Sequence, residues 1–259
     1  KGPWGLTDDP AHNSRTDLEP WTTNLIGFLG EYQWNASARW TAFLGGRLDK
    51  HSFTGWLTSP KVAIVFSPTE SYTAKLLYNR SVRKSDDFEL KQQHDADPDS
   101  DGEVERVDSF ELRHDYRPGE TTMLSAAAFW QEVDIIGWVG APRYQSRRVG
   151  TEEIIGLEAE ASYEVRRHRL SSSYAFTKLR DFSLADEAIR NQTETSAPYG
   201  YGNDLHHFPR HVGKLAWRCK LYSRLTTVSS LRLLWGFHGA RHYAEYNNEV
   251  LQQNGISRT

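Results

Sequence analysis

Residues 106–130 constrain the fold of this chain most strongly, because they form two long amphipathic segments around a Pro-Gly turn. In the first segment, Phe110 and Leu112 fall on one face of an extended chain, whereas Glu111 and Arg113 fall on the other. Arms of this length exceed the usual globular strand of about five or six residues. They match the roughly 9–11 residues of a tilted membrane-spanning strand. The segment therefore predicts a β-hairpin that is long enough to cross a membrane.

The same pairing of amphipathic segments recurs along the chain, at residues 22–34 with 39–49, 61–67 with 72–81, 153–165 with 170–178, and 211–222 with 226–237. The turns within each pair are short, whereas the connections between pairs are long and polar, at residues 82–105, 135–150 and 179–208. Outer-membrane barrels have this asymmetry, with short periplasmic turns and long extracellular loops. We therefore predict an all-β fold, with about ten antiparallel strands that form part of a transmembrane β-barrel.

Composition is compatible with such a barrel. The chain has 259 residues, 38% of them hydrophobic and 25% charged, and its mean hydropathy is -0.67. A barrel strand turns only every second side chain to lipid, so its hydropathy is low. No stretch reaches the roughly 18 apolar residues of a membrane helix. A net charge of -3 provides no basic surface for nucleic acid, and the single cysteine, Cys219, excludes a disulfide framework.

Aromatic residues make up 12% of the chain and gather near the ends of the predicted strands. Those next to the short turns are Trp34, Tyr72, Tyr116, Tyr163 and Tyr222, and those toward the long connections are Trp130, Phe176, Trp235 and Phe237. Aromatic belts at both membrane interfaces are typical of barrels. Each aromatic taken alone also suits the core of a soluble sheet. However, all the predicted hairpins have a short turn at one end and long connections at the other, and this shared arrangement favours the barrel.

Short motifs spread over residues 20–238 resemble those of a known protein family. They are GGRLD at 45–49, SPK at 59–61, YNRSVR at 78–83, SFEL at 109–112, GLEAE at 156–160, SYAFT at 173–177 and PRH at 209–211. In this order and spacing they resemble the later barrel strands of the TonB-dependent outer-membrane receptors. The resemblance implies an antiparallel barrel of the 22-stranded receptor type, with residues 1–259 forming a partial barrel domain. Because Lys1 follows no starting Met or signal peptide and no plug sequence is present, we expect a fragment that lacks the plug and the final strands.

The resemblance also implies a function. Such a receptor binds a scarce ligand at the surface of a Gram-negative cell and imports it to the periplasm with energy from the TonB-ExbB-ExbD complex. The ligand is most often a ferric siderophore or another iron complex, with haem, cobalamin or a carbohydrate as alternatives. Outer-membrane lipid and lipopolysaccharide are the expected surroundings; no enzyme activity and no cofactor are implied. A passive porin and an outer-membrane barrel enzyme are the two alternatives, and a plug with a TonB-contacting segment would exclude the porin.

The candidate ligand-binding residues lie in the long connections. Arg143, Arg147 and Arg148 suit an anionic siderophore or lipopolysaccharide phosphates, because arginine binds such groups in a bidentate manner. His206 and His207 suit iron or haem. For the arginines a solvated loop is the simpler interpretation, and for the histidines a position at the surface or at an interface. No catalytic residues are predicted.

An acidic stretch, Asp97, Asp99 and Asp101 followed by Gly102, matches the first half of a calcium-binding loop. The twelfth position of that pattern holds Asp108 instead of glutamate, and strands rather than helices are expected on both sides. An acidic, solvated loop is therefore favoured over a metal site.

Overall fold

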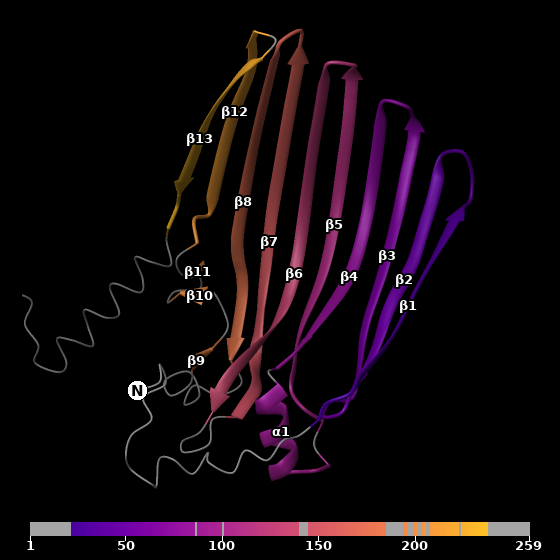
Figure 1. Cartoon of the computed structure of the whole chain (residues 1–259), viewed down its shortest axis with the longest axis vertical. Helices are drawn as coiled ribbons and strands as arrows, with labels where there is room; N and C mark the ends of the chain where they lie inside the picture. Colours follow the sequence, from indigo (N-terminus) through magenta and orange to yellow (C-terminus); the bar gives the residue numbers. More distant parts are fainter. Residues whose placement is uncertain are drawn as a thin grey trace, which may run out of the picture.

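The structure is a computed structural model that describes residues 22–85, 87–99, 101–139, 145–184, 194–195, 199–200, 204–205, 208–222 and 224–237. The long strands form one antiparallel sheet in the order β1-β2-β3-β4-β5-β6-β7-β8-β12-β13. The sheet bends into an open arc (Figure 1). Within the described residues, β1 and β13 each pair with a single neighbour, so both are edges of this sheet.

The long strands are β1 (Leu25–Asn35), β2 (Trp40–His51), β3 (Trp56–Thr69), β4 (Tyr72–Lys84), β5 (Val104–Gly119), β6 (Thr122–Val139), β7 (Gln145–Val165), β8 (His168–Leu184), β12 (His211–Tyr222) and β13 (Leu225–Trp235). One helix, α1 (Asp87–Ala96), lies between β4 and β5. The short β9 (Glu194–Thr195) pairs with β6, and β10 (Tyr199–Gly200) pairs with β11 (Asp204–Leu205). Among the described helices, none is long and apolar enough to cross a membrane.

The predicted hairpins are confirmed, since β1-β2, β3-β4, β5-β6, β7-β8 and β12-β13 are neighbours joined by short turns at one end of the sheet (Figure 1). All three predicted connections are shorter than expected, since β8 also continues into residues 179–184. Residues 82–105 contain α1, and most of residues 135–150 continue as β6 and β7. In β7 one residue, Val149, is inserted, since Ile135 lies opposite Gly150 and Ile136 lies opposite Arg148. The insertion breaks the alternation by which a strand is recognised in a sequence.

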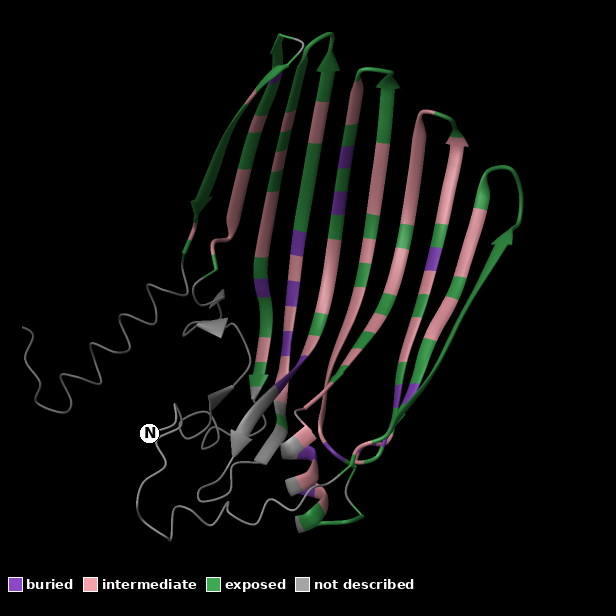
Figure 2. Cartoon of the chain, viewed as in Figure 1, coloured by how far each residue is buried: buried purple, intermediate pink, exposed green. Residues whose placement is uncertain are grey.

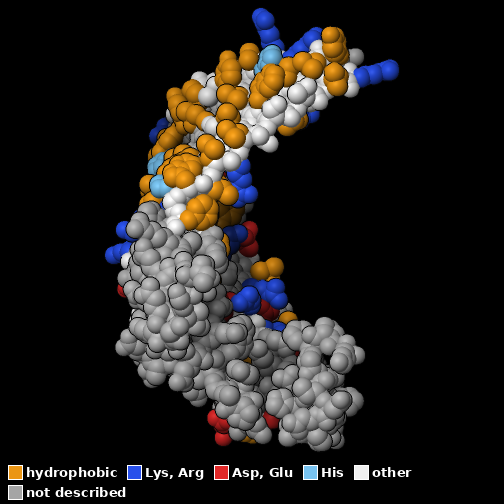
Figure 3. All heavy atoms as spheres, turned by 90° about the vertical axis from the view of Figure 1, so that its left-hand side faces the viewer, with side chains coloured by type: hydrophobic (Ala, Val, Ile, Leu, Met, Phe, Trp, Pro, Cys, Tyr) orange, Lys and Arg blue, Asp and Glu red, His pale blue; other side chains and the backbone are white. Residues whose placement is uncertain are grey.

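Register gives the sheet two different faces. Residues directly opposite each other point the same way, and Leu76, Leu112, Ala128 and Leu157 form one such row across β4 to β7. This face is apolar and exposed: Leu157 retains 55% of its accessible surface. In Figure 3 hydrophobic side chains gather on the convex side of the arc, and charged side chains project into its hollow side.

Burial is confined to a small part of the sheet. On the concave face Ile154 and Leu179 form a cluster with Phe129 and Phe182, and Ala63, Ser125 and Ala127 are also buried. Figure 2 shows buried residues as short bands within the strands and around α1, whereas the strand ends near the short turns are exposed. The sheet is therefore a curved wall rather than one layer of a closed two-layer core.

Candidate functional site

The end of the sheet with the long connections carries α1. We call this end the rim (Figure 1). It comprises α1 and the parts of the strands that lie beyond Trp130, toward the long connections. Leu90 of α1 is completely buried. A Cβ atom on Gly102 would overlap the Leu90 side chain and would lie 2.5 Å from the carbonyl oxygen of Phe53. The close approach that glycine allows at position 102 lets the helix pack against the β2-β3 loop.

A histidine beside a carboxylate lies where α1 begins. The backbone N–H of Phe53 donates to Nδ1 of His51 (3.3 Å), so the remaining ring proton is on Nε2, which lies 3.5 Å from Asp87 Oδ1. Burial lowers the pKa of His51 from 6.5, and the neighbouring ammonium of Lys84 adds to this effect. Lys84 also donates to Asp87 and lowers the pKa of that carboxyl group. At neutral pH the rim therefore holds a neutral imidazole next to a Lys–Asp ion pair.

Of the predicted ligand-binding residues, the structure gives a partner to Arg148. Its guanidinium lies 2.8 Å from Asp134 Oδ1, and the Asp134 side chain is only 6% exposed. Burial raises the pKa of Asp134, although Arg148 opposes this effect. Arg147 lies in β7, where the structure does not describe its side chain, and Arg143, His206 and His207 lie outside the described residues. For all five residues ligand binding stays a prediction.

The acidic stretch does not form a metal site among the described residues, where no group of three or more His, Cys, Asp or Glu side chains is placed to hold an ion. Asp97 and Asp99 are exposed. Asp108 lies in β5 and accepts hydrogen bonds from Arg80 Nε (2.8 Å) and Nη2 (3.0 Å). The stretch also follows directly on α1, so the expectation that strands flank it on both sides was wrong.

Glu152 is a rim residue that the sequence interpretation missed. It is 2% exposed on the concave side of β7, where its register partners are Val133 and Phe182. Its Oε2 atom has no hydrogen-bond partner among the described residues. Burial raises the pKa of Glu152 to about 7. The alternation along β7 contained the signal, because Glu152 falls on the same face as Ile154 and not on the face of the exposed Leu157.

Replacing Glu152 by glutamine is expected to stabilise the protein at alkaline pH. The pKa of Glu152 rises from 4.5 to about 7 on folding, so its stabilising contribution is complete below the lower value and is lost as the pH rises through the upper one. Glutamine mimics the protonated form. The free energy of unfolding of the Glu152→Gln variant should equal that of the wild type near pH 4 and exceed it by about 3 kcal/mol at pH 8.

Urea unfolding followed by tryptophan fluorescence at several pH values measures this difference. Glu158→Gln is the control, because Glu158 is exposed on the same strand and its replacement should change stability by less than about 0.5 kcal/mol. A pH-independent effect of Glu152→Gln would contradict the prediction.

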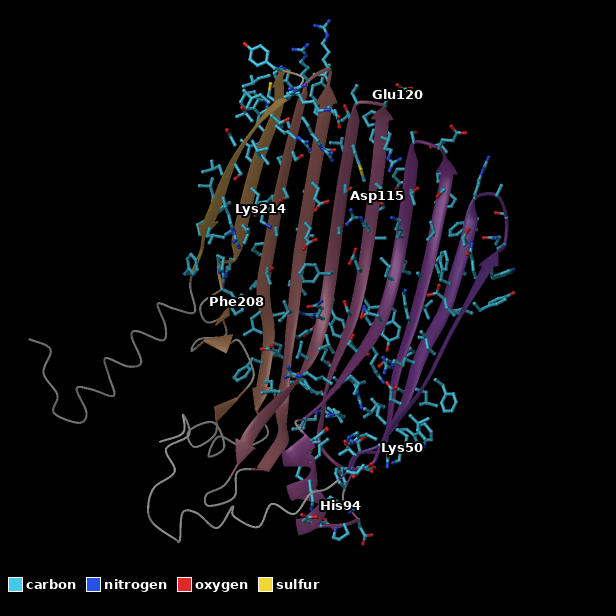
Figure 4. All side chains as sticks on the ribbon, in the orientation of Figure 1. Lys50, His94, Asp115, Glu120, Phe208 and Lys214 are labelled. Carbon is cyan, nitrogen blue, oxygen red and sulfur yellow. The ribbon has the colours of Figure 1, made fainter. Side chains whose placement is uncertain are left out.

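On the concave face, between the rim and the short turns, Asp115 is the centre of a hydrogen-bond network. This carboxylate accepts hydrogen bonds from Lys75 Nζ (2.8 Å), Ser125 Oγ (2.8 Å) and Arg113 Nε (3.0 Å). Arg113 also lies 3.6 Å from Glu160. The label of Asp115 in Figure 4 marks this network, which lies toward the short turns. The predicted charged face of the hairpin at residues 106–130 thus forms a network of ion pairs between strands.

A hollow of about 410 Å³ lies beside this network. Small polar side chains line it, among them Ser125, Ser162, Ser171 and Ser173, together with Lys214. Hydroxyl groups and a cation offer hydrogen-bond donors, so the concave wall can bind polar or anionic molecules.

A curved antiparallel sheet with an apolar convex face and a charged concave face is the arrangement typical of the wall of a β-barrel. The model of the family "TonB dependent receptor-like, beta-barrel" matches residues 3–258. The chain belongs to this family of TonB-dependent receptor barrels. No protein of curated function matches it.

Solved structures share the fold. The iron transporter FrpB from Neisseria meningitidis is 15% identical with a TM-score of 0.61, and the match covers 81% of this chain and 32% of FrpB. A variant of the ferric enterobactin receptor PfeA from Pseudomonas aeruginosa is 14% identical with a TM-score of 0.61, over 81% and 32% of the two chains. The copper transporter OprC is 16% identical with a TM-score of 0.55, over 84% and 35%. The chain thus spans about a third of the length of these proteins.

Proposed function

We propose that this chain is part of an outer-membrane receptor that binds a scarce metal complex at the cell surface, most specifically a ferric siderophore or another iron complex, and imports it to the periplasm with energy delivered through TonB. The observation that carries the proposal is the two-faced arc that matches the receptor barrel family along nearly the whole chain. The names of FrpB and PfeA support iron, and the name of OprC keeps copper open as the metal.

The proposed position in the membrane follows from two groups of aromatic side chains, one toward each end of the strands. On the convex face Trp130 lies beside Phe110, with ring centroids 5.7 Å apart, and Trp235 stacks on His211 at 5.1 Å. At the other end of the strands lie Tyr116 and Tyr163. Residues 122–130 of β6 connect the two levels, a length that matches the roughly 9–11 residues of a tilted membrane strand. The short turns then face the periplasm and the rim faces the outside.

The proposed location of each partner follows from this orientation. The ligand would meet the rim, and the candidate residues for its binding are still those proposed from the sequence: Arg143, Arg147, Arg148, His206 and His207, within residues 82–105, 135–150 and 179–208. Lipopolysaccharide would surround the convex face at the rim, and the TonB-ExbB-ExbD complex would act from the periplasm. The alternatives are a passive porin, which would need no TonB, and a barrel enzyme.

Deleting the gene is expected to abolish growth on one iron or copper complex under metal restriction, because the receptor is the route of entry. The measurement is growth, together with uptake of radioactive metal, on a panel of ferric siderophores, haem and copper complexes. A strain without TonB should lose the same uptake. Uptake that continues without TonB would favour the porin, and growth unchanged on every complex would contradict the proposal.

The rim can be tested in the same strain. Replacing residues 87–96 by a Gly-Ser linker of equal length should weaken ligand binding to whole cells at least about tenfold, since it removes the packed helix that supports the neighbouring loops. Arg167→Gln, at the short-turn end, is the control and should leave binding unchanged. Equal binding by both variants would place the ligand elsewhere.

A further inference from the structure

The convex face carries a histidine next to the short turn between β7 and β8. His168 begins β8, and it points to the convex side because it lies an even number of residues from Phe176, which is opposite Leu157. Its ring stacks on the indole of Trp217 in β12, with the ring centroids 5.9 Å apart and the planes 10° apart. Both β8 and β12 pair with two neighbours, so this ring pair lies within the sheet and away from its edges.

The hydrogen bond between these two rings determines where the imidazole carries its proton. The indole N–H of Trp217 donates to Nδ1 of His168 (3.3 Å), and an indole nitrogen can only donate. Nδ1 therefore carries no proton, and the ring N–H is at Nε2. His168 is exposed, and within the described part of the chain Nε2 has no hydrogen-bond partner. His114 and His211 also use Nδ1, but their partners are tyrosine hydroxyls, which can donate or accept.

The turn before His168 has an unusual backbone. Arg166 has a φ of 53°, in the left-handed region, and no other non-glycine residue of the described ranges has a positive φ. Such a turn usually holds asparagine or glycine, because this conformation is costly for a residue with a long side chain. The other turn residue, Arg167, donates to the carbonyl oxygen of Leu221 (3.3 Å) and links the turn to β12.

No contact within the described chain offsets the backbone cost at Arg166. Its side chain is exposed, and among the described residues it forms no ion pair with a carboxylate. Glu164 is the acidic residue nearest to it in the sequence, but Glu164 is opposite Arg169 and alternates to the concave face. The guanidinium of Arg166 is therefore available to a partner outside the chain.

Apolar and aromatic side chains surround this turn on the convex side. Leu170 and Trp217 remain 42% and 38% exposed, and Tyr163 and Tyr222, toward the same short turns, remain 47% and 73% exposed. Figure 3 shows histidine side chains among the hydrophobic ones on this side of the arc. Aromatic side chains at the end of an apolar face mark the level of lipid headgroups. The N–H of His168 and the guanidinium of Arg166 thus lie where an apolar surface ends.

We propose that the β7-β8 turn binds the phosphate of an anionic phospholipid, with Nε2 of His168 and the guanidinium of Arg166 as the donors. Phosphate oxygens accept strong hydrogen bonds from such groups, and the acyl chains of the lipid would lie along Leu170. A free phosphate would make no use of the apolar surface. The inference goes beyond the proposed function, because lipid binding at this turn requires neither an imported ligand nor TonB.

The test is native mass spectrometry of the complete receptor in detergent, titrated with phosphatidylglycerol. Arg166→Asn and His168→Phe each remove one donor; asparagine tolerates the left-handed conformation, and phenylalanine keeps an aromatic ring beside Trp217. His168→Gln keeps an N–H donor near the position of Nε2. The matched controls are Arg167→Gln, in the same turn, and His114→Phe, on the same face near the short turns.

Each donor variant is expected to weaken phosphatidylglycerol binding at least about fivefold. His168→Gln and the two controls should stay within about twofold of wild type, because exposed charges that do not touch the phosphate are screened by salt. Arg166→Asn should also melt at a higher temperature without lipid, since it relieves the backbone cost at this position. Its loss of binding would then not reflect misfolding.

Unchanged binding in either donor variant would overturn the proposal. Equal weakening by Arg167→Gln would overturn it in favour of a non-specific cationic surface, and equal weakening by His168→Gln and His168→Phe would show that Nε2 is not the donor. Phosphatidylcholine should bind at least about fivefold more weakly, because its ammonium meets no carboxylate on this face. Competition by a large excess of inorganic phosphate would identify a site for free phosphate and refute the lipid site. None of these readouts depends on uptake, so the proposed function can fail without affecting this result.

Discussion

Replacing Gly156 by valine is expected to destabilise the folded protein by about 3 kcal/mol. A Cβ atom at this position would overlap the ring of Phe129 and would lie 2.7 Å from the backbone oxygen of Phe176. The ring can move, but the backbone of β8 cannot move without breaking its pairing with β7. Moving Phe129 also removes it from Ile154 and Leu179, the main buried apolar cluster among the described residues.

The effect is measured as a loss in the free energy of unfolding in urea, with the protein in lipid vesicles. Gly30→Val is the matched control, because a Cβ atom on Gly30 of β1 meets nothing within 4 Å, and valine has the higher strand propensity. Adding Phe129→Ala to Gly156→Val should recover part of the loss. If Gly156→Val were as stable as Gly30→Val, the packing of Phe129 over Gly156 would be wrong.

Replacing Leu90 by alanine should release α1 from the rim while leaving the wall folded. Leu90 is fully buried between the β2-β3 loop and Gly102, and truncating a buried leucine costs about 2–5 kcal/mol. Because α1 contacts few other elements, the loss should appear as local opening and not as global unfolding. Hydrogen exchange of the α1 amides should become about 100-fold faster.

Lys91→Ala is the control for this helix. Lys91 pairs with Asp95 on the exposed side of α1, and such a pair contributes only about 0.3–0.5 kcal/mol. Amides of β5 and β6 serve as an internal reference and should exchange at the wild-type rate in both variants. Equal protection of α1 in Leu90→Ala and wild type would show that the helix is held by other contacts.

Much of the wall could be predicted from local sequence. The alternation of Phe110 and Leu112 with Glu111 and Arg113 predicted both the hairpin and the side on which each residue lies, because the side-chain period of a strand is two. The Pro-Gly dipeptide marked the region of the turn, but β5 continues through Gly119 with an irregular register after Tyr116, and the turn lies at Glu120 and Thr121.

The rim was harder to predict. Helix α1 has weak apolar periodicity, and its place depends on Leu90 meeting Gly102, twelve residues later in the chain. The extension of β7 was hidden by the residue inserted at Val149, where the alternation fails although the pairing with β6 continues. The ion pair of Arg148 with Asp134 across the strands was not predicted from the sequence. Contacts between residues that are distant in sequence decide these features.

The sequence by itself determined that this protein is a wall of paired amphipathic strands, because the alternation of side chains and the position of turns are local properties. Only the tertiary structure decided which charges are neutralised. Register places Asp115 between Lys75 and Arg113 and brings Lys214 opposite Arg232. Among the described residues, it also leaves the buried Oε2 atom of Glu152 without a hydrogen-bond partner. These relations depend on which residues of neighbouring strands lie opposite each other, and a single strand carries no information about that alignment.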